Sequence, residues 1–233
     1  MSAHSVQTPK RRSLGKAAVR RRRDQIPGID EKRAVNLVLE MMALPGVSGR
    51  EGPVVQFITR RLRRAGIAAS RIHTDDAHRR AATGGEVGNL ICRLPGRNRR
   101  GPRRLLAAHL DTVPLCAASR PVLRNGHVCS ADPAKALGAD NRAGAAVLLT
   151  AALELARHDV PHPPLSFFWP VQEETALVGV RFASLSLLAR PKLAFNFDGG
   201  DASDVTIGAT GDYQIQIEVK GRASHAGAHP EQG

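Results

Sequence analysis

The chain has 233 residues, of which 42% are hydrophobic, 24% charged and 3% aromatic, and its formal net charge is +13. This apolar fraction excludes a wholly disordered chain, and no apolar run approaches the roughly 18 residues that a membrane span needs. The three cysteines form no C-x-x-C pair, which excludes a disulfide framework and a zinc ribbon, so we expect a soluble, cytoplasmic protein.

The positive charge lies in the first half of the chain. Residues 1–29 are basic and lack hydrophobic periodicity, which predicts a disordered tail. Residues 60–104 hold thirteen arginines against three acids, whereas residues 105–233 carry a net charge of −3. A rival hypothesis is a nucleic-acid-binding protein that uses residues 1–33 and 60–104. Neither region contains a base-reading motif, so we do not expect a nucleic-acid partner.

Helical signals open the structured part of the chain. Asp30 is a suitable N-cap for a helix that ends at Leu44. The run Ser48–Glu51 has the spacing of a capping box, and apolar residues then recur at helical spacing from Val54 to Ala65. Residues 87–94 read as a strand that ends before Pro95.

Three short apolar runs follow, at 105–110, 165–171 and 193–197. Their continuous apolar character is typical of buried parallel strands. A long helical segment at 143–157 provides a crossover connection between the first two. We therefore predict an α/β fold with a mixed, largely parallel sheet flanked by helices.

Acidic side chains and one histidine cluster around the ends of these runs. Sites of open α/β sheets are built at the carboxyl edge of the strands, and an imidazole with several carboxylates suits Zn²⁺, Mn²⁺ or Co²⁺. Asp140 opens the long helix, where it could instead be a helix N-cap. The metal-site candidates are His109, Asp111, Asp140, Glu173, Glu174 and Asp198.

The two strand-end pairs differ in spacing. His109 and Asp111 are two apart and share a face, so Asp111 can accept the second ring N–H of His109. Glu173 and Glu174 are adjacent and point in different directions, so one could hold a metal while the other faces substrate. Adjacent buried carboxylates would be unfavourable without a cation between them.

The sequence pattern changes near residue 207. Residues 213–220 alternate polar and apolar side chains. This pattern predicts a strand of an antiparallel sheet that has one solvent-exposed face. We expect a tail at 1–29, a catalytic domain at 30–207 and the start of a second domain at 208–233.

The motifs resemble, in order and spacing, those of the M20 metallopeptidases, and they are most similar to the peptidase T-like, tripeptide aminopeptidase branch. The resemblance covers about residues 30–233. Its last two motifs are similar to the start of the dimerisation, or lid, domain of that family. The motifs are His109–Pro114, Gly138–Gly144, Glu173-Glu174 with Gly179, Asp198–Gly200, and Gly221–Gly227 with Pro230–Gly233.

This resemblance implies two zinc ions in each active site. Asp140 would bridge both ions, and His109 and Asp198 would complete one site. Glu174 would serve the other site. The family supplies a last histidine ligand after the lid, so the resemblance also implies that the chain is C-terminally incomplete and that its second site lacks one ligand.

The resemblance also implies roles in catalysis. Asp111 would orient His109, and Glu173 would be the general base. His225 would reach the active site of a partner subunit in a homodimer formed through the lid, and would help to hold the oxyanion.

The expected function is zinc-dependent hydrolysis of an amide bond in short peptides, by an aminopeptidase of tripeptidase type. One alternative is an M20-type amidohydrolase that removes the acyl group of N-acyl amino acids. Another is an inactive, truncated homologue.

Overall fold

The structure is a computed structural model that describes residues 28–97, 99–158 and 160–208, and residues 211, 215, 217, 218, 228 and 231. His225, nearly all of the predicted tail and most of the predicted strand at 213–220 lie outside this part of the chain. The chain divides into two units, residues 1–199 and residues 200–233, and the elements below belong to the first. Among the described residues no helix has the length and apolar character that would let it cross a membrane.

A five-stranded sheet forms the centre of the first unit, in the order β1-β2-β6-β3-β7. β3 is parallel to both β6 and β7, whereas β2 is antiparallel to β1 and β6. This arrangement confirms the prediction of a mixed α/β sheet. The strands are β1 (Ile72–Thr74), β2 (Leu90–Leu94), β3 (Arg104–Ala107), β6 (Leu165–Trp169) and β7 (Leu193–Asn196).

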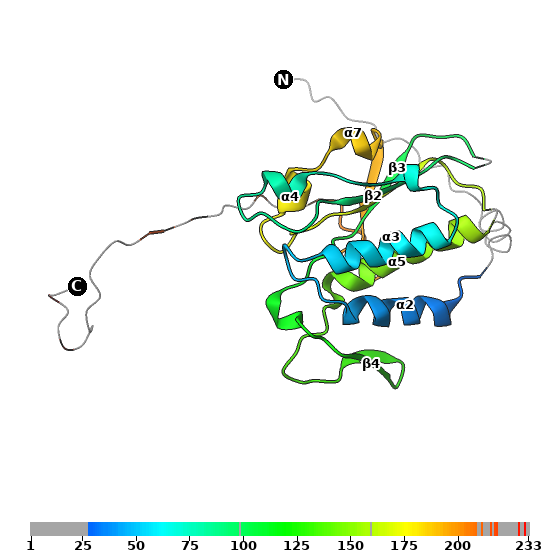
Figure 1. The fold of residues 1–233 in the computed structure, drawn as a ribbon. Helices are drawn as coiled ribbons and strands as arrows, with labels where there is room; N and C mark the ends of the chain where they lie inside the picture. The colour runs from blue at the N-terminus through cyan, green and yellow to red at the C-terminus, as the bar shows by residue number, and fades with distance from the viewer. Residues whose placement is uncertain are drawn as a thin grey trace, which may run out of the picture. The chain divides into compact units, whose positions relative to one another are not determined.

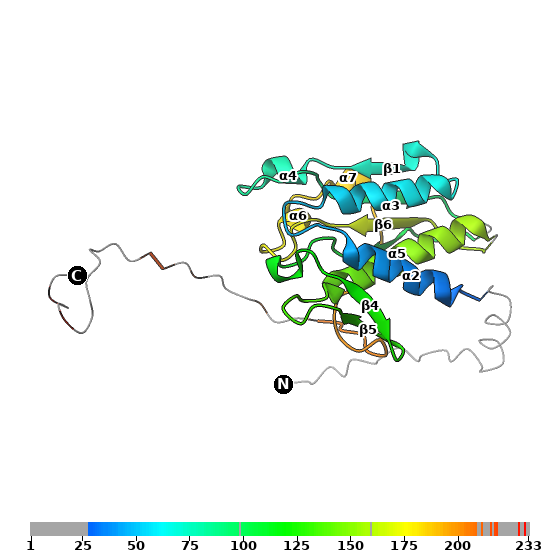
Figure 2. The same cartoon turned by 60° about the horizontal axis from the view of Figure 1, so that its bottom comes forward.

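Helices lie on both faces of this sheet (Figures 1 and 2). Three long helices, α2 (Glu31–Ala43), α3 (Gly52–Arg64) and α5 (Ala139–Arg157), cover one face. The short helix α7 (Leu185–Leu188) packs on the other. The remaining elements are η1 (Ala69–Arg71), α4 (Ala77–Arg80), η2 (Pro114–Cys116), α6 (Val178–Arg181) and a hairpin of β4 (Pro121–Arg124) and β5 (His127–Ser130).

Side chains of the central strands alternate between the two faces. Phe167 and Trp169 of β6 join the large core under the three long helices, whereas Phe168 joins the small core under α7. Trp169 is fully buried, and its Nε1 donates to the carbonyl oxygen of Ala145 at 3.2 Å. Its ring stacks on Phe167 with the centroids 5.9 Å apart. Trp169 therefore fastens α5 to the centre of the sheet.

Replacing Trp169 by Phe should destabilise the chain by about 1–2 kcal/mol, because it removes the hydrogen bond to Ala145 and leaves a small cavity. Urea unfolding followed by circular dichroism measures this. Leu185→Ala is the control, since Leu185 is 75% exposed, and this variant should unfold at the wild-type midpoint. A Trp169→Phe midpoint equal to that of the wild type would contradict the packing described for β6 and α5.

The starts of α2 and α3 differ in how they are capped. Asp30 caps α2 as predicted, and its Oδ1 accepts from the backbone N–H of Arg33 at 3.0 Å. The predicted capping box at 48–51 is wrong, because α3 begins at Gly52 without a side-chain cap. The Ser48 hydroxyl instead donates to Oδ2 of Asp111 at 2.7 Å. In a capping box this hydroxyl would accept from the backbone N–H of residue 51, whereas here it donates to an ionised carboxylate, which makes a stronger hydrogen bond than one between neutral groups.

The prediction that residues 193–197 form a buried strand is also wrong. β7 lies at the edge of the sheet, with only β3 beside it in the described part of the chain. Leu193 and Phe195 are consequently 52% and 43% exposed. The parallel direction of this strand is as predicted.

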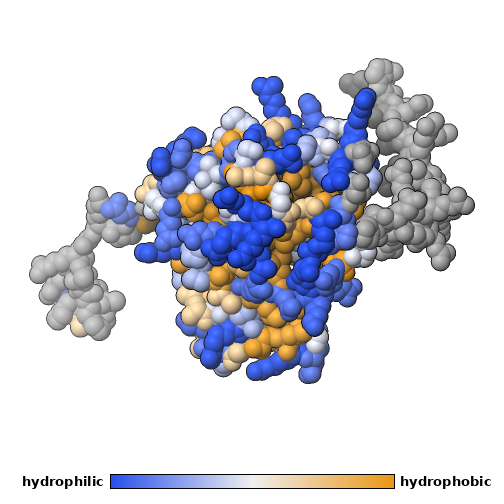
Figure 3. All heavy atoms as spheres, turned by 45° about the vertical axis from the view of Figure 1, so that its right-hand side comes forward, coloured by the Kyte–Doolittle hydropathy of each residue, from blue (hydrophilic) through white to orange (hydrophobic). Residues whose placement is uncertain are grey.

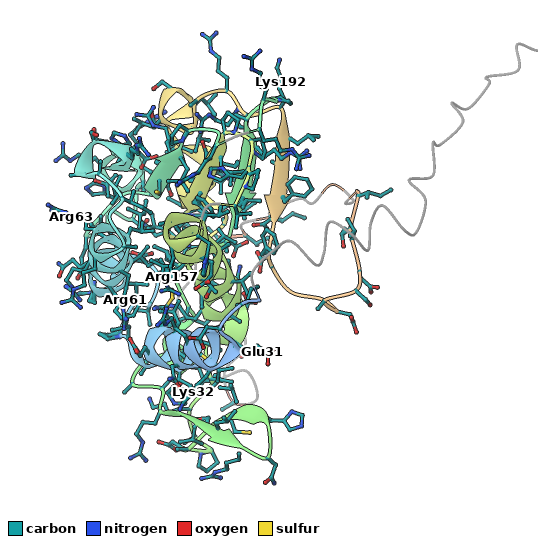
Figure 4. All side chains as sticks on the ribbon, turned by 90° about the vertical axis from the view of Figure 1, so that its right-hand side faces the viewer. Glu31, Lys32, Arg61, Arg63, Arg157 and Lys192 are labelled. Atoms are coloured by element: carbon teal, nitrogen blue, oxygen red, sulfur yellow. The ribbon has the colours of Figure 1, made fainter. Side chains whose placement is uncertain are left out.

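The arginines of α3 lie on its outer side. Figure 4 shows Arg61 and Arg63 pointing away from the sheet. Arg61 pairs with Glu40 and covers the Phe57 ring, with Cζ 4.9 Å from the ring centroid. Figure 3 shows hydrophilic side chains over much of one side of the molecule. Arg63 and Arg64 are exposed, so the outer face of α3 is solvated.

Candidate metal centre

Three parallel strands deliver the candidate residues to one edge of the sheet. His109 follows β3, Glu173 and Glu174 follow β6, and Asp198 follows β7. The backbone N–H of Leu110 donates to Pro170 O, and that of Phe197 donates to Ala107 O. These bonds extend the parallel pairing to the strand ends, which brings the four side chains close together.

His109 is at the centre of this group, and its ring is almost completely buried. Its Nε2 lies 3.0 Å from Asp140 Oδ1, 3.7 Å from Asp198 Oδ1 and 3.9 Å from Glu173 Oε2. One ligand atom from each of His109, Asp140 and Glu174 can be chosen so that all three lie within 4.8 Å of one another. The structure thus brings all the predicted metal-site side chains around one imidazole.

Asp140 reaches the site because the next residue caps the helix. The Asn141 Oδ1 accepts from the backbone N–H of Gly144 at 3.1 Å, so Asn141 performs the N-cap role that was the alternative explanation for Asp140. Residues 140 and 141 are joined by a cis peptide bond. Before them, Gly138 has a φ of +76°, a conformation that glycine adopts without steric strain. The Asp140 carboxylate, which does not cap the helix, lies beside the His109 ring.

The start of α5 is also packed tightly against the end of β7. The side-chain amide of Asn141 donates to Phe197 O at 2.8 Å. A Cβ atom at Gly144 would collide with that same carbonyl oxygen, so only glycine permits this approach. The contact fixes Asp198 relative to Asp140.

Asp111 is fully buried and connects both strand-end pairs. The His109 Nδ1 lies 3.1 Å from the Asp111 carbonyl oxygen and 3.4 Å from its Oδ1. The backbone N–H groups of Glu173 and Glu174 donate to its Oδ1 and Oδ2 at 2.9 and 3.1 Å. Burial favours the neutral acid, but the hydrogen bonds from His109 and Ser48 outweigh it and lower the pKa of Asp111. Asp111 thus holds His109 and the Glu173-Glu174 backbone together.

The other carboxyl groups have raised pKa values. For Glu173, Glu174 and Asp198, burial raises the pKa, and repulsion between neighbouring carboxylates adds to the rise, although His109 opposes it. Acids that repel one another around an imidazole favour a bound cation, which would neutralise them. The donor set of one imidazole and several carboxylates fits Zn²⁺. The residues present therefore fit a metal cofactor.

Zinc affinity should rise with pH, because the ring of His109 is charged in the metal-free chain. Burial lowers the pKa of His109, but the Asp111 carboxylate and its neighbours outweigh burial and raise this pKa to about 9. Only the neutral ring binds a metal, so below pH 9 zinc must displace a proton. We expect the affinity to increase about tenfold per pH unit from about pH 6 to 8. Competition with a zinc-chelating dye measures it, and a flat profile would contradict this protonation state.

Two buried charged residues of the surroundings were not singled out from the sequence. Arg142 donates through Nη1 to Met41 O at 3.2 Å and through Nη2 to Gly46 O at 2.9 Å. Glu51 accepts from the backbone of the loop after β6. In the sequence, each of these residues is only a charged residue beside an apolar helical segment, which does not reveal its burial. Glu51 was assigned to the predicted capping box instead.

The fold, a mixed α/β sheet with an imidazole and carboxylates at the carboxyl ends of its parallel strands, is that of the catalytic domains of zinc exopeptidases. Solved structures share this fold. The chain superposes on a tripeptidase from Staphylococcus aureus (TM-score 0.67, 24% identity, 74% of this chain and 44% of that chain). It also superposes on the aminopeptidase PepT from Bacillus cereus (TM-score 0.67, 26% identity, the same shares). The chain belongs to peptidase family M28, whose model matches residues 89–228.

Curated relatives extend the similarity at the sequence level. The protein YqjE of Bacillus subtilis is 28% identical over 206 residues, which are 88% of this chain and 53% of YqjE. Carboxypeptidase G2 of Pseudomonas sp. strain RS-16 is 30% identical over 151 residues, which are 62% of this chain and 35% of that enzyme. The chain spans about half the length, or less, of the curated relatives it matches.

Proposed function

We propose that this chain is part of a zinc-dependent aminopeptidase that removes the N-terminal residue from short peptides, of the M20, peptidase T-like type. The observation that carries the proposal is the position of His109 Nε2, which faces Asp140, Asp198 and Glu173 across 3.0–3.9 Å. The likeness to a tripeptidase and to PepT supports peptide as the substrate class. The motifs of residues 109–200 support the M20 type.

The metal would be held by the side chains at the strand ends. Asp140 would bridge two zinc ions, with His109 and Asp198 on one of them and Glu174 on the other. When bound, zinc polarises the scissile carbonyl and lowers the pKa of a water molecule towards about 7. The group identified around His109 supports this assignment.

The proton transfers would belong to Glu173. Its Oε2 lies beside the same ring nitrogen as the ligands, at 3.9 Å, and burial with neighbouring carboxylates raises its pKa. It would take a proton at Oε2 from the attacking water and then give it to the leaving amine. Asp111 would keep His109 oriented throughout.

Two further assignments belong to the same proposal. His225 would help to hold the oxyanion in the active site of a partner subunit, within a homodimer formed by a lid domain that begins at residue 208. The three cysteines are free, which supports a reducing cytoplasm as the compartment.

Hydrolysis of the tripeptide Leu-Gly-Phe by the zinc-loaded chain tests the proposal. An aminopeptidase releases leucine first, and it leaves the N-acetylated tripeptide intact. Mass spectrometry identifies the first product. Release of phenylalanine first would indicate a carboxypeptidase, and hydrolysis of N-acetyl-leucine without any attack on the tripeptide would indicate a deacylase. Either result would refute the aminopeptidase assignment.

A further inference from the structure

Three consecutive backbone N–H groups after β6 donate to two buried carboxylates. Gln172 donates to Glu51 Oε1 at 3.0 Å, and the next two residues donate to Asp111. Glu51 and Asp111 are both 0% exposed. The turn that carries Glu173 and Glu174 is therefore shaped from inside the protein by these two acids.

Glu51 links this turn to a distant part of the chain. Its Oε1 also accepts from the backbone N–H of Gly49 at 2.9 Å, so one oxygen joins the start of α3 to the loop after β6. Its Oε2 is buried and has no hydrogen-bond partner among the described residues. A buried carboxylate with an unsatisfied oxygen lowers stability. The stability of the core therefore gives no reason for a glutamate at position 51.

Both the side chain and the backbone of Gln172 are fixed by hydrogen bonds. Its side-chain Nε2 donates to Gly84 O at 2.8 Å, and its Oε1 accepts from Thr83 Oγ1 at 2.8 Å. Its φ is +52°, a left-handed conformation that is unfavourable for a residue with a Cβ atom. The hydrogen bond to Glu51 offsets this strain. Without Glu51, the N–H of Gln172 would lose its acceptor and the turn would be free to relax.

We propose that Glu51 is a positioning residue that fixes the turn at 172–174 and thereby sets where the Glu173 and Glu174 carboxylates lie. It acts through the backbone of Gln172, without touching substrate. The inference rests on the proposed function for the roles of the two glutamates, but the geometry that Glu51 imposes exists in the metal-free chain.

The test compares Glu51→Gln and Glu51→Ala with a matched control, Glu86→Gln, in the full chain. Glu86 also accepts from a backbone N–H at the start of α3, from Gly52 at 3.3 Å, but at the surface. Hydrogen exchange by NMR, without metal, reports on the amides of residues 172–174. We expect exchange at residue 172 to be about tenfold faster in Glu51→Ala, smaller acceleration in Glu51→Gln, whose amide oxygen still accepts, and no change in Glu86→Gln.

Zinc affinity provides the second measurement. Replacing residues that orient metal ligands typically weakens metal affinity by about 10- to 100-fold. We therefore expect the Kd for zinc to be about tenfold higher in Glu51→Ala. In Glu51→Gln the Kd should lie between this value and that of the wild type. If Glu51→Ala does not fold, Glu51→Gln provides the test by itself. Faster amide exchange at residue 172 in Glu51→Gln than in Glu86→Gln would then support the proposal. Exchange that is unchanged at 172–174, or accelerated equally at the Trp169 amide in the core, would overturn the proposal. A zinc-loaded wild type that releases phenylalanine first from Leu-Gly-Phe would refute the proposed function and leave the exchange result standing.

Discussion

Glu173→Gln should reduce the hydrolysis of Leu-Gly-Phe by about a hundred- to ten-thousandfold and leave zinc bound. Replacing the carboxylate by an amide removes the group that accepts the proton of the attacking water, and general bases contribute rate factors of this size. The zinc ligands proposed above do not include Glu173, so the zinc affinity should remain within a few-fold of the wild type. Steady-state kinetics and zinc titration measure the two effects separately.

Glu31→Gln serves as the control for this variant. Glu31 lies in the exposed first turn of α2, so the variant should keep both activity and metal. Full activity of Glu173→Gln would show that another group is the base. A parallel loss of zinc would show that Glu173 is a ligand instead.

Asp140→Ala should abolish tight zinc binding. Asp140 Oδ1 is the carboxylate atom nearest to His109 Nε2 among the described residues, at 3.0 Å, and it is the proposed bridge between two ions. Replacing residues that only support metal ligands weakens metal affinity by about 10- to 100-fold, so the loss of a bridging ligand should exceed a hundredfold. The rise in melting temperature that zinc gives the wild type should disappear, because binding energy contributes to folding stability.

Asp76→Ala is the matched control. Asp76 is an exposed acid that pairs with Arg79, and its replacement should leave the zinc-induced rise in melting temperature intact. An Asp140→Ala chain that is stabilised by zinc as strongly as the wild type would contradict the assignment of Asp140.

The parts of the fold that depend on local sequence could be predicted. Continuous apolar runs identified β3 and β6, and a helical pattern identified α5. Because the parallel strands end at the same edge, the order of acids and histidine along the chain was sufficient to predict that His109, Asp140 and Asp198 would meet. The structure brings them within hydrogen-bond or ion-pair distance.

The features that could not be predicted from the sequence depend on contacts between residues that are distant in the chain. Ser48 and Glu51 have the spacing of a local capping box, but they bond to Asp111 and Gln172, which lie 63 and 121 residues away. Local periodicity carries no information about such a choice. The apolar run of β7 indicates burial, yet the described residues place it at an edge, since burial depends on what covers a strand.

The motifs and the family model agree on the class of enzyme. The model of peptidase family M28 matches residues 89–228, a span that includes every candidate site residue. The resemblance of the motifs to M20 peptidases concerns the same strand ends and the same metal chemistry. Motif order and the family model therefore both indicate a metal-dependent peptidase domain.

Anomalous diffraction at the zinc absorption edge, from crystals of the zinc-loaded chain, tests the metal centre most directly. The metal centre described here predicts an anomalous peak about 2.0–2.1 Å from His109 Nε2, with Asp140 as a further ligand. A zinc-loaded crystal with no peak beside His109, or with its peak at the cysteines instead, would contradict it.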